Sequence, residues 1–340
     1  MKDFRFTRIK AVLVVIVALF VSFGCTPKTE ETAGGKENKI AALFPGSIQD
    51  ADYNTIGYIA LQEAANSEGI KSSYSEKVAV PDAERVLKEY VNADFNIIFV
   101  HGSQFNGAVA KVAPDNPDVT FIIEVDAKPE NPASNIWYIE RNFHNGFYVL
   151  GTVAAMKTET GKIGYLGGLE LPFVRGEINA INQAIRDQKS SAKLEYIFVG
   201  DFNDPLKARQ AAEGLMSQGV DVIISAVNLG NFGIYSAVKE ADRPVFITAT
   251  YTDKVSQAPN NYLTSDLFDF GVPVKGIVSK IIAGEKSGHW FMEYGEGQAR
   301  STLFPINNVS DSVNAKVKRI SADVASGKII VKPVLGEILK

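Results

Sequence analysis

The chain has 340 residues, a formal net charge of -4 at pH 7 and one cysteine. This acidic balance argues against nucleic acid as a partner, because a nucleic-acid-binding surface needs an excess of lysine and arginine. A single cysteine excludes internal disulfides, so stability must come from core burial, and the length suffices for two domains of ordinary size.

The first 24 residues have the pattern of a secretory signal peptide. Four basic residues precede an uncharged apolar run at 11–23, which is shorter than the roughly 20 residues that a membrane-spanning helix needs. Gly24 and Cys25 follow, and a lone cysteine there is similar to the lipidation site of bacterial lipoproteins. Residues 25–38 lack large apolar side chains and predict a flexible tether. We therefore predict an exported protein that a lipid on Cys25 anchors to the membrane, with ordinary cleavage as the alternative.

Strand-like and helix-like segments alternate from residue 39 onward. The expected strands are 39–43, 96–100, 119–125, 135–139, 162–166, 194–199, 221–227, 244–248, 262–265, 290–294 and 302–304. The expected helices are 55–68, 84–91, 108–113, 143–156, 172–186, 204–217, 234–240, 271–283 and 310–326. Such alternation predicts an α/β fold with parallel sheets covered by helices on both faces.

The alternation restarts at Lys162, which indicates two similar lobes, and the fragmentary end of the chain indicates that it returns to complete both. We expect the first lobe at 39–140 plus 250–289 and the second lobe at 141–249 plus 290–340. Three crossings would make a hinge and a cleft. The expected crossings are Trp137–Arg141, Thr248–Tyr251 and Gly288–Phe291.

Signatures of catalysis are absent from the sequence. It has no His-Glu-x-x-His, no cysteine cluster, no Gly-x-Ser-x-Gly and no P-loop, and Gly164–Gly168 lacks the Gly-x-Gly-x-x-Gly order. We therefore expect no catalytic residues, metal or cofactor. The enzyme alternative would use Asp50, Asp52 and Asp204 for acid–base work, but aspartates at helix starts are better explained as caps.

Aromatic and polar side chains gather after the expected strands, where ligands of open α/β sheets bind. The candidate ligand-binding residues are Ser47, Asp50, Tyr53, Asn54, Gln104, Phe105, Phe173, Phe202, Asn228, Tyr251 and Asp266. Aromatic rings stack on flat rings, and amides and carboxylates read polar edges. These residue types predict a small polar ligand with a flat ring, held between the lobes.

Several motifs together resemble the basic membrane protein family of ABC transporter substrate-binding lipoproteins, which is similar to the bacterial purine nucleoside receptor. They include Phe44–Asp50 followed by Asp52–Asn54, Phe99–Phe105 and Gly200–Pro205, and the resemblance covers about residues 39 to 335. It implies a type I periplasmic-binding-protein fold, with two Rossmann-like lobes joined by a three-strand hinge. It also implies a purine nucleoside or base as ligand, ABC permease subunits as partners and a monomer on the outer or periplasmic face of the membrane.

Two departures from the family pattern favour a base over a nucleoside. The segment Thr248–Thr252 lacks the acidic pair that a ribose diol calls for, and Phe268 stands where nucleoside-binding members tend to have lysine. Two alternatives remain open. One is a surface sensor that delivers its ligand to a receptor, and the other is a binder of another small polar solute such as a sugar.

Overall fold

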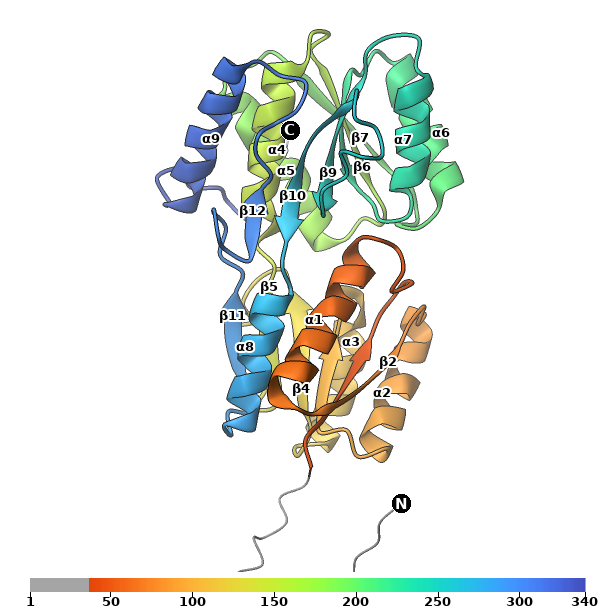
Figure 1. Ribbon diagram of the computed structural model, residues 1–340, viewed down its shortest axis with the longest axis vertical. Helices are drawn as coiled ribbons and strands as arrows, with labels where there is room; N and C mark the ends of the chain where they lie inside the picture. Colours follow the sequence, from red (N-terminus) through yellow and green to blue (C-terminus); the bar gives the residue numbers. More distant parts are fainter. Residues whose placement is uncertain (1–36, 340) are drawn as a thin grey trace, which may run out of the picture. The chain divides into compact units, whose positions relative to one another are not determined.

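The computed structural model describes residues 37–339, which form two α/β lobes, each built on a six-stranded sheet (Figure 1). The predicted α/β class with two similar lobes is therefore confirmed. The predicted signal peptide, Cys25 and most of the predicted tether lie outside the described residues. Within residues 37–339, no helix has the length and apolar character needed to cross a membrane.

The sheet of the first lobe is entirely parallel. Its strands are β1 (Lys39–Leu43), β2 (Lys71–Ser75), β3 (Ile97–Val100), β4 (Thr120–Val125), β5 (Ile136–Glu140) and β11 (Gly288–Phe291), in the order β11-β5-β4-β3-β1-β2. Helices α1 (Tyr53–Glu68) and α8 (Gly271–Ile282) pack side by side on one face, and α2 (Ala83–Asn92) and α3 (Asn106–Val112) pack together on the other. The chain thus folds as a doubly wound layer.

The sheet of the second lobe repeats this plan with one antiparallel edge strand. Its strands are β6 (Lys162–Gly167), β7 (Lys193–Phe198), β8 (Val222–Ala226), β9 (Phe246–Tyr251), β10 (Tyr262–Phe268) and β12 (Arg300–Thr302), in the order β12-β10-β9-β8-β6-β7. Its helices are α4 (Phe143–Lys157), α5 (Pro172–Asp187), α6 (Pro205–Ser217), α7 (Asn231–Glu240) and α9 (Asp311–Ala325). Figure 1 shows α4, α5 and α9 grouped apart from α6 and α7.

The unbroken apolar strands are explained by burial on both faces, as parallel sheets require. In β1, Ile40 and Ala42 belong to the core under α1, whereas Ala41 and Leu43 belong to the core under α2 and α3. Because successive side chains of a strand point to opposite faces, one short apolar run fills two cores at once.

Within residues 37–339 the chain crosses between the lobes three times, and two crossings differ from the prediction. The first lies at Arg141–Asn142, between β5 and α4. The last follows β11 rather than lying within it, so Trp290 and Phe291, which pair with β5, belong to the first lobe rather than the second. The expected second crossing at Thr248–Tyr251 is wrong, because β9 and β10 both lie in the second sheet. The return to the first lobe instead comes between the end of β10 and α8, so residues 250–268 belong to the second lobe rather than the first.

Candidate functional site

In each sheet the order of the strands changes direction at one strand, and these two switch points position the candidate site. β1 lies between β2 and β3, and β6 lies between β7 and β8. Loops that leave the carboxyl ends of strands at such a point diverge and leave a crevice, which is where α/β folds bind ligands. The loop after β1 leads into α1, and the loop after β6 leads into α5.

A cavity is lined by residues from both sets of loops. The first lobe contributes Pro45, Tyr53 and Gln104, Arg141 comes from the first crossing, and the second lobe contributes Leu171, Phe173, Phe202, Asn203, Asn228 and Tyr251. Six of the eleven predicted site residues are thus brought together around one space. Its volume is about 50 Å³, well below the roughly 300–1,000 Å³ of ligand pockets. A ligand with a ring can therefore enter only if the lobes or side chains move apart.

The aromatic side chains of the second lobe are arranged as parallel plates. The rings of Phe173 and Phe202 are inclined by only 16° and their centroids lie 6.5 Å apart. Phe143 stacks behind Phe173 with centroids 4.9 Å apart. Across the cavity, the ring of Tyr53 lies 5.2 Å from the ring of Tyr251. Rings from both lobes therefore face the same space.

Tyr53 is held in place by a buried network of the first lobe. Its ring stacks on His101 at 3.8 Å, and its hydroxyl donates to Glu124 Oε2 at 2.6 Å. His101 Nε2 lies 2.9 Å from the carbonyl oxygen of Tyr53, and Nδ1 lies 2.5 Å from Glu124 Oε1. Burial opposes the charge of Glu124, but His101, Arg141 and Tyr53 together hold the pKa of this carboxyl below its ordinary value. The tyrosine ring is therefore rigidly presented.

Arg141 joins this network to the cavity. Its Nη1 lies 3.4 Å from Glu124 Oε2, and its Nη2 donates to Ser103 Oγ at 2.9 Å and to Asp126. Its guanidinium also lies 4.6 Å from the ring centroid of Phe173, within cation–π distance. Although burial opposes the charge, Asp126 and Glu124 hold the pKa of Arg141 above its ordinary range. Arg141 is therefore a charged group in a site that is otherwise lined by uncharged residues.

Asp50 and Asn54, both predicted ligand contacts, instead build the turn that starts α1. The carboxylate of Asp50 accepts hydrogen bonds from the backbone amides of Asp52, Asn54 and Thr55 and from the side chains of Asn54 and Thr55. Asn54 Oδ1 accepts from the amide of Gly46 at 3.0 Å. Buried carboxylates at helix starts satisfy unpaired amides in this way. Their polar groups are engaged within the loop that carries Tyr53.

The other three predicted contacts also lie outside the cavity lining. Ser47 Oγ accepts from the amide of Gln49, Phe105 is fully buried in the core under α2 and α3, and Asp266 forms a fully buried pair with Arg300. Burial raises the pKa of Asp266 to about 6 despite the attraction of Arg300. These residues serve the loop, the core and the crossing respectively, and six predicted residues remain at the cavity.

Arg141 and Asn203 line the cavity but are not among the eleven predicted site residues. Arg141 directly follows a strand that ends in Glu140, so its position at a crossing was the available signal. Asn203 follows Phe202 in the loop after β7. Glu124 carried a second signal in the sequence, because a charged residue inside the buried strand β4 requires a partner. Its partner is His101, which could be identified only from the pairing of β3 with β4.

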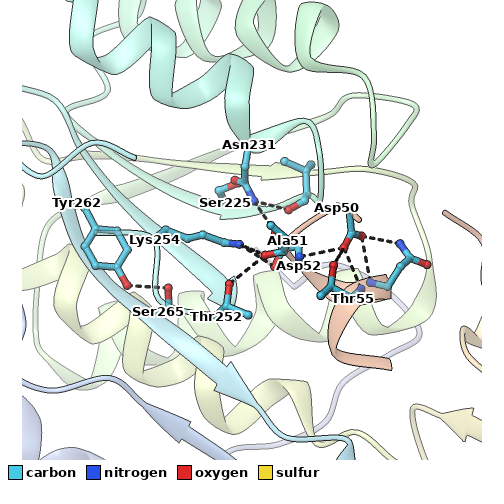
Figure 2. Close-up of polar contacts among 12 residues, drawn as sticks. Asp50, Ala51, Asp52, Thr55, Ser225, Asn231, Thr252, Lys254, Tyr262 and Ser265 are labelled. Atoms are coloured by element: carbon cyan, nitrogen blue, oxygen red, sulfur yellow. Dashed lines mark hydrogen bonds and ion pairs between the residues drawn. The ribbon is translucent and has the colours of Figure 1, made fainter. Parts of the chain in front are cut away.

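The two lobes also contact each other directly beside the cavity (Figure 2). Lys254, in the loop after β9, donates to the carbonyl oxygen of Ala51 at 2.7 Å and lies 3.3 Å from Asp52 Oδ1. Asn231 Nδ2, at the start of α7, lies 3.4 Å from Asp52 Oδ2. Thr252 Oγ1 donates to Ala51 at 3.3 Å. We name Ala51, Asp52, Asn231, Thr252 and Lys254 the interlobe latch.

Asp52 is the least favourable charge of this latch. It is only 1% exposed, and burial raises the pKa of its carboxyl to about 7, although Lys254 opposes the rise. Since Lys254 and Asn231 both come from the second lobe, separation of the lobes would return Asp52 to water. The latch therefore couples the protonation of one carboxyl to the contact between lobes.

A larger hollow of about 590 Å³ lies entirely on the second lobe. It is lined by β12, the turn at Gly295–Gly297 and one side of α9. It contains none of the predicted site residues and none of the first lobe. Movement of one lobe against the other would not shape it, so we place the candidate site at the smaller interlobe cavity.

The aspartates of the enzyme alternative all have structural partners. Asp50 caps α1, Asp52 pairs with Lys254, and Asp204 accepts from the amide of Lys207 at 3.0 Å at the start of α6. Within residues 37–339, no group of three or more His, Cys, Asp or Glu side chains has a metal-binding arrangement. The arrangement is suited to enclosing a ligand.

The chain matches known proteins over most of its length. Residues 37–331 match the family model described as ABC transporter substrate-binding protein, PnrA-like. The chain is 27% identical over 307 residues to a purine-binding protein of Brucella abortus, covering 89% of this chain and 84% of that protein. It is 26% identical over 266 residues to basic membrane protein A2 of Borrelia garinii subsp. bavariensis, covering 77% of each.

The fold is also that of solved solute-binding proteins. An ABC transporter solute-binding protein from Aeropyrum pernix K1 superposes with a TM-score of 0.73 at 18% identity, covering 87% of this chain and 94% of that one. This confirms the type I periplasmic-binding-protein fold. The matched residues include both lobes and all three crossings, and they confirm the resemblance drawn from the motifs. The chain belongs to the PnrA-like family of ABC transporter substrate-binding proteins.

Proposed function

We propose that this protein captures a purine-type base between its lobes and delivers it to the permease of an ABC importer. Phe202 stacks on one face of the base, and the rings of Phe173 and Tyr53 contact its other face. The remaining contacts come from Gln104, Asn228 and Tyr251, which line the same cavity. Because the cavity is small when the lobes touch, the ligand enters an open form, and closure then encloses it.

The observation that carries this proposal is the pair of near-parallel rings, Phe173 and Phe202. A flat ring inserted between two others needs about 7 Å between their planes, since atoms in contact lie about 3.5 Å apart. The centroids are 6.5 Å apart, inclined by 16°. A small displacement of the Phe202 loop would open a slot for a planar heterocycle. The purine-binding relative from Brucella abortus supports the same ligand class.

A base is favoured over a nucleoside by what the cavity lining lacks. Among the described residues, no carboxylate lines the cavity. The nearby carboxylates of Asp52, Glu124 and Asp126 are paired with Lys254, His101 and Arg141. A ribose diol is best held by free carboxylate oxygens, which accept two hydroxyl protons. The lining instead offers amides and rings, which suit the edges and faces of a base.

The proposal is tested first by native mass spectrometry of protein purified without refolding, to identify any bound small molecule. Isothermal titration calorimetry then measures affinities for purine bases, purine nucleosides and monosaccharides. Tyr53→Ala and Phe202→Ala should each weaken binding of the base by about 1–3 kcal/mol, the usual cost of losing one stacking ring.

Tyr196→Ala is the matched control, because Tyr196 lies on edge strand β7 and is 44% exposed. It should leave the affinity unchanged. Unchanged affinity in both site variants would reject the stacking model, and a bound solute without a flat ring would reject the ligand class.

The N-terminal pattern supports a further part of the proposal, namely membrane attachment through a lipid on Cys25. A binding protein tethered by residues 25–38 would stay near its permease without a membrane-spanning helix. Metabolic labelling with a palmitate analogue should mark the wild-type protein and not Cys25→Ser. The Cys25→Ser variant should also be released from the membrane fraction. Equal labelling of both would reject the anchor.

A further inference from the structure

Two polar atoms of the cavity-lining residues have no partner within the described chain, and their chemistry indicates which purine the site prefers. They are Nε of Arg141 and Oδ1 of Asn203, and both atoms are buried. One is a charged hydrogen-bond donor and the other is a neutral acceptor. A buried donor or acceptor that lacks a partner is costly, so a bound ligand that satisfies both gains affinity.

Arg141 is already positioned and needs no anion from the ligand. Arg141 is buried, with 2% of its surface exposed. Its Nη2 is occupied by Ser103 Oγ and Asp126, and its Nη1 lies 3.4 Å from Glu124. Two carboxylates thus balance its charge. Because a guanidinium has five N–H groups and no acceptor, its free N–H requires an uncharged acceptor such as a carbonyl oxygen.

The amide of Asn203 has the complementary requirement. Its Oδ1 accepts no hydrogen bond from residues 37–339, while its backbone amide is fixed by Asp201 Oδ1 at 2.8 Å. The loop is therefore anchored and its side-chain oxygen requires a donor. A ring that carries a carbonyl beside an N–H, a lactam, offers one acceptor and one donor on adjacent atoms.

This requirement separates the two common kinds of purine. In a 6-oxopurine, position 6 is a carbonyl acceptor and N1 carries a proton. In a 6-aminopurine, position 6 is a donor and N1 is an acceptor, so both partners are reversed. Arginine reads the O6 and N7 acceptors of guanine elsewhere and is mismatched to the amino group of adenine. A site that leaves its own polar groups unpaired rejects the wrong analogue.

We propose that the site selects 6-oxopurines over 6-aminopurines, with Arg141 donating to the carbonyl and Asn203 accepting from the ring N–H. This rests on the proposed function, because it refines the ligand of the same cavity. Arg141 and Asn203 are specificity-determining residues, while Tyr53 and Phe202 supply stacking that either kind of purine can use. Selectivity is thereby separated from the general affinity for flat rings.

Calorimetry with hypoxanthine, adenine and unsubstituted purine at one pH tests the proposal. Wild type should bind hypoxanthine about 10–100-fold more tightly than adenine, the range expected when a polar contact is reversed. In Arg141→Lys, which keeps the charge but loses Nε and the planar fork, the ratio of the two affinities should fall toward one. Asn203→Leu should lower the ratio as well, at a position that is only half-buried. Arg209→Lys, on the surface of α6, is the matched control and should keep the wild-type ratio.

The outcomes distinguish the two levels of the proposal. Equal or tighter binding of adenine by wild type overturns the selectivity and leaves purine capture standing. A wild-type ratio that persists in both site variants also overturns it, because other groups would then discriminate. Binding of none of the three bases, together with a different co-purified solute, overturns the proposed function itself. If Arg141→Lys does not fold, Asn203→Leu and the wild-type ratio decide.

Discussion

The interlobe latch should control ligand affinity, and Lys254→Met tests this with little change in side-chain length. Lys254 Nζ lies 3.3 Å from Asp52 Oδ1 and 2.7 Å from the carbonyl oxygen of Ala51. The side chains of Lys254 and Asp52 are 9% and 2% exposed. The substitution leaves a carboxylate enclosed between the lobes without its cation, so the closed form loses stability relative to the open form.

The magnitude follows from the burial and from the protonation of Asp52. Breaking a buried ion pair by removing one partner costs about 3–5 kcal/mol. Since the pKa of Asp52 is raised to about 7 by burial, the carboxyl avoids part of this cost by taking a proton at neutral pH. We therefore expect a loss of about 1–3 kcal/mol in ligand binding, which is about 5–150-fold in affinity.

Calorimetry at pH 6 and pH 8 checks this reasoning. The loss should be larger at pH 8, where more of Asp52 is ionised and needs Lys254, than at pH 6. Lys239→Met, at an exposed position late in α7, is the control for removing a surface charge. Adding Asp52→Asn to Lys254→Met should recover part of the affinity, because no charge is then enclosed. A loss of the same size at both pH values, or no loss, would refute the coupling between the latch and closure.

Three further predictions follow from single sites. In wild type, the pKa of Asp52 is about 7 while the lobes touch and is expected to return toward 3.8 when they part. Between pH 3.8 and pH 7 the closed form therefore binds more protons than the open form. Ligand affinity measured by calorimetry should fall as the pH rises from 5 to 7 and should stay constant above pH 7. Burial raises the pKa of Glu177 from 4.5 to about 8. The free energy of unfolding of wild type should therefore fall as the pH rises from 4.5 to 8. Glu177→Gln should remove that loss, and its melting temperature should exceed that of wild type more at pH 8 than at pH 5. Gly146→Ala would place a Cβ within 2.1 Å of Asp266 Oδ2, so chemical denaturation should show a loss of about 1–3 kcal/mol. The control Gly214→Ala, with no neighbouring atom within 4 Å, should be neutral or stabilising by up to about 1 kcal/mol.

Apolar runs allowed the central strands to be predicted, but the edge strand β2 (Lys71–Ser75) was missed. Its sequence is Lys-Ser-Ser-Tyr-Ser, and its residues are exposed or half-buried. It forms a strand because it pairs with β1, with Ala42 opposite Tyr74. An edge strand buries little apolar surface, so its conformation depends on a neighbour that is distant in sequence.

The second crossing was misplaced because β9 and β10 are joined without a helix. Parallel neighbours are usually connected through a helix, so the loop at 252–261 suggested that the chain had left the second lobe. It instead returns to pair β10 with β9, with Asp266 opposite Thr250. The same loop carries Lys254 to the first lobe. The loop that stands in place of the usual helix thus supplies two residues of the latch, Thr252 and Lys254.

The aspartates of the first loop show why residue type alone could not assign the site. Asp50 and Asp52 are two positions apart, yet one caps a helix and the other pairs with the opposite lobe. Tyr53 beside them faces the cavity. Capping depends on local backbone, whereas pairing and cavity lining depend on loops from the other sheet. The sequence predicted a loop between this strand and helix α1, but it could not assign the separate roles of the residues within the loop.

Arg141 lies at a crossing between the lobes and also lines the cavity. Its backbone carbonyl, with that of Asn142, accepts hydrogen bonds from Arg300 of the second lobe. Its side chain is held by Glu124, Asp126 and Ser103 of the first lobe. A residue tied to both bodies at a crossing moves little when they rotate, whereas a loop contact such as Lys254 can separate. The Arg141 donor therefore stays in place in both forms, whereas Asn203 moves with the second lobe, so the contact with the ligand carbonyl should form first and closure should complete the selectivity.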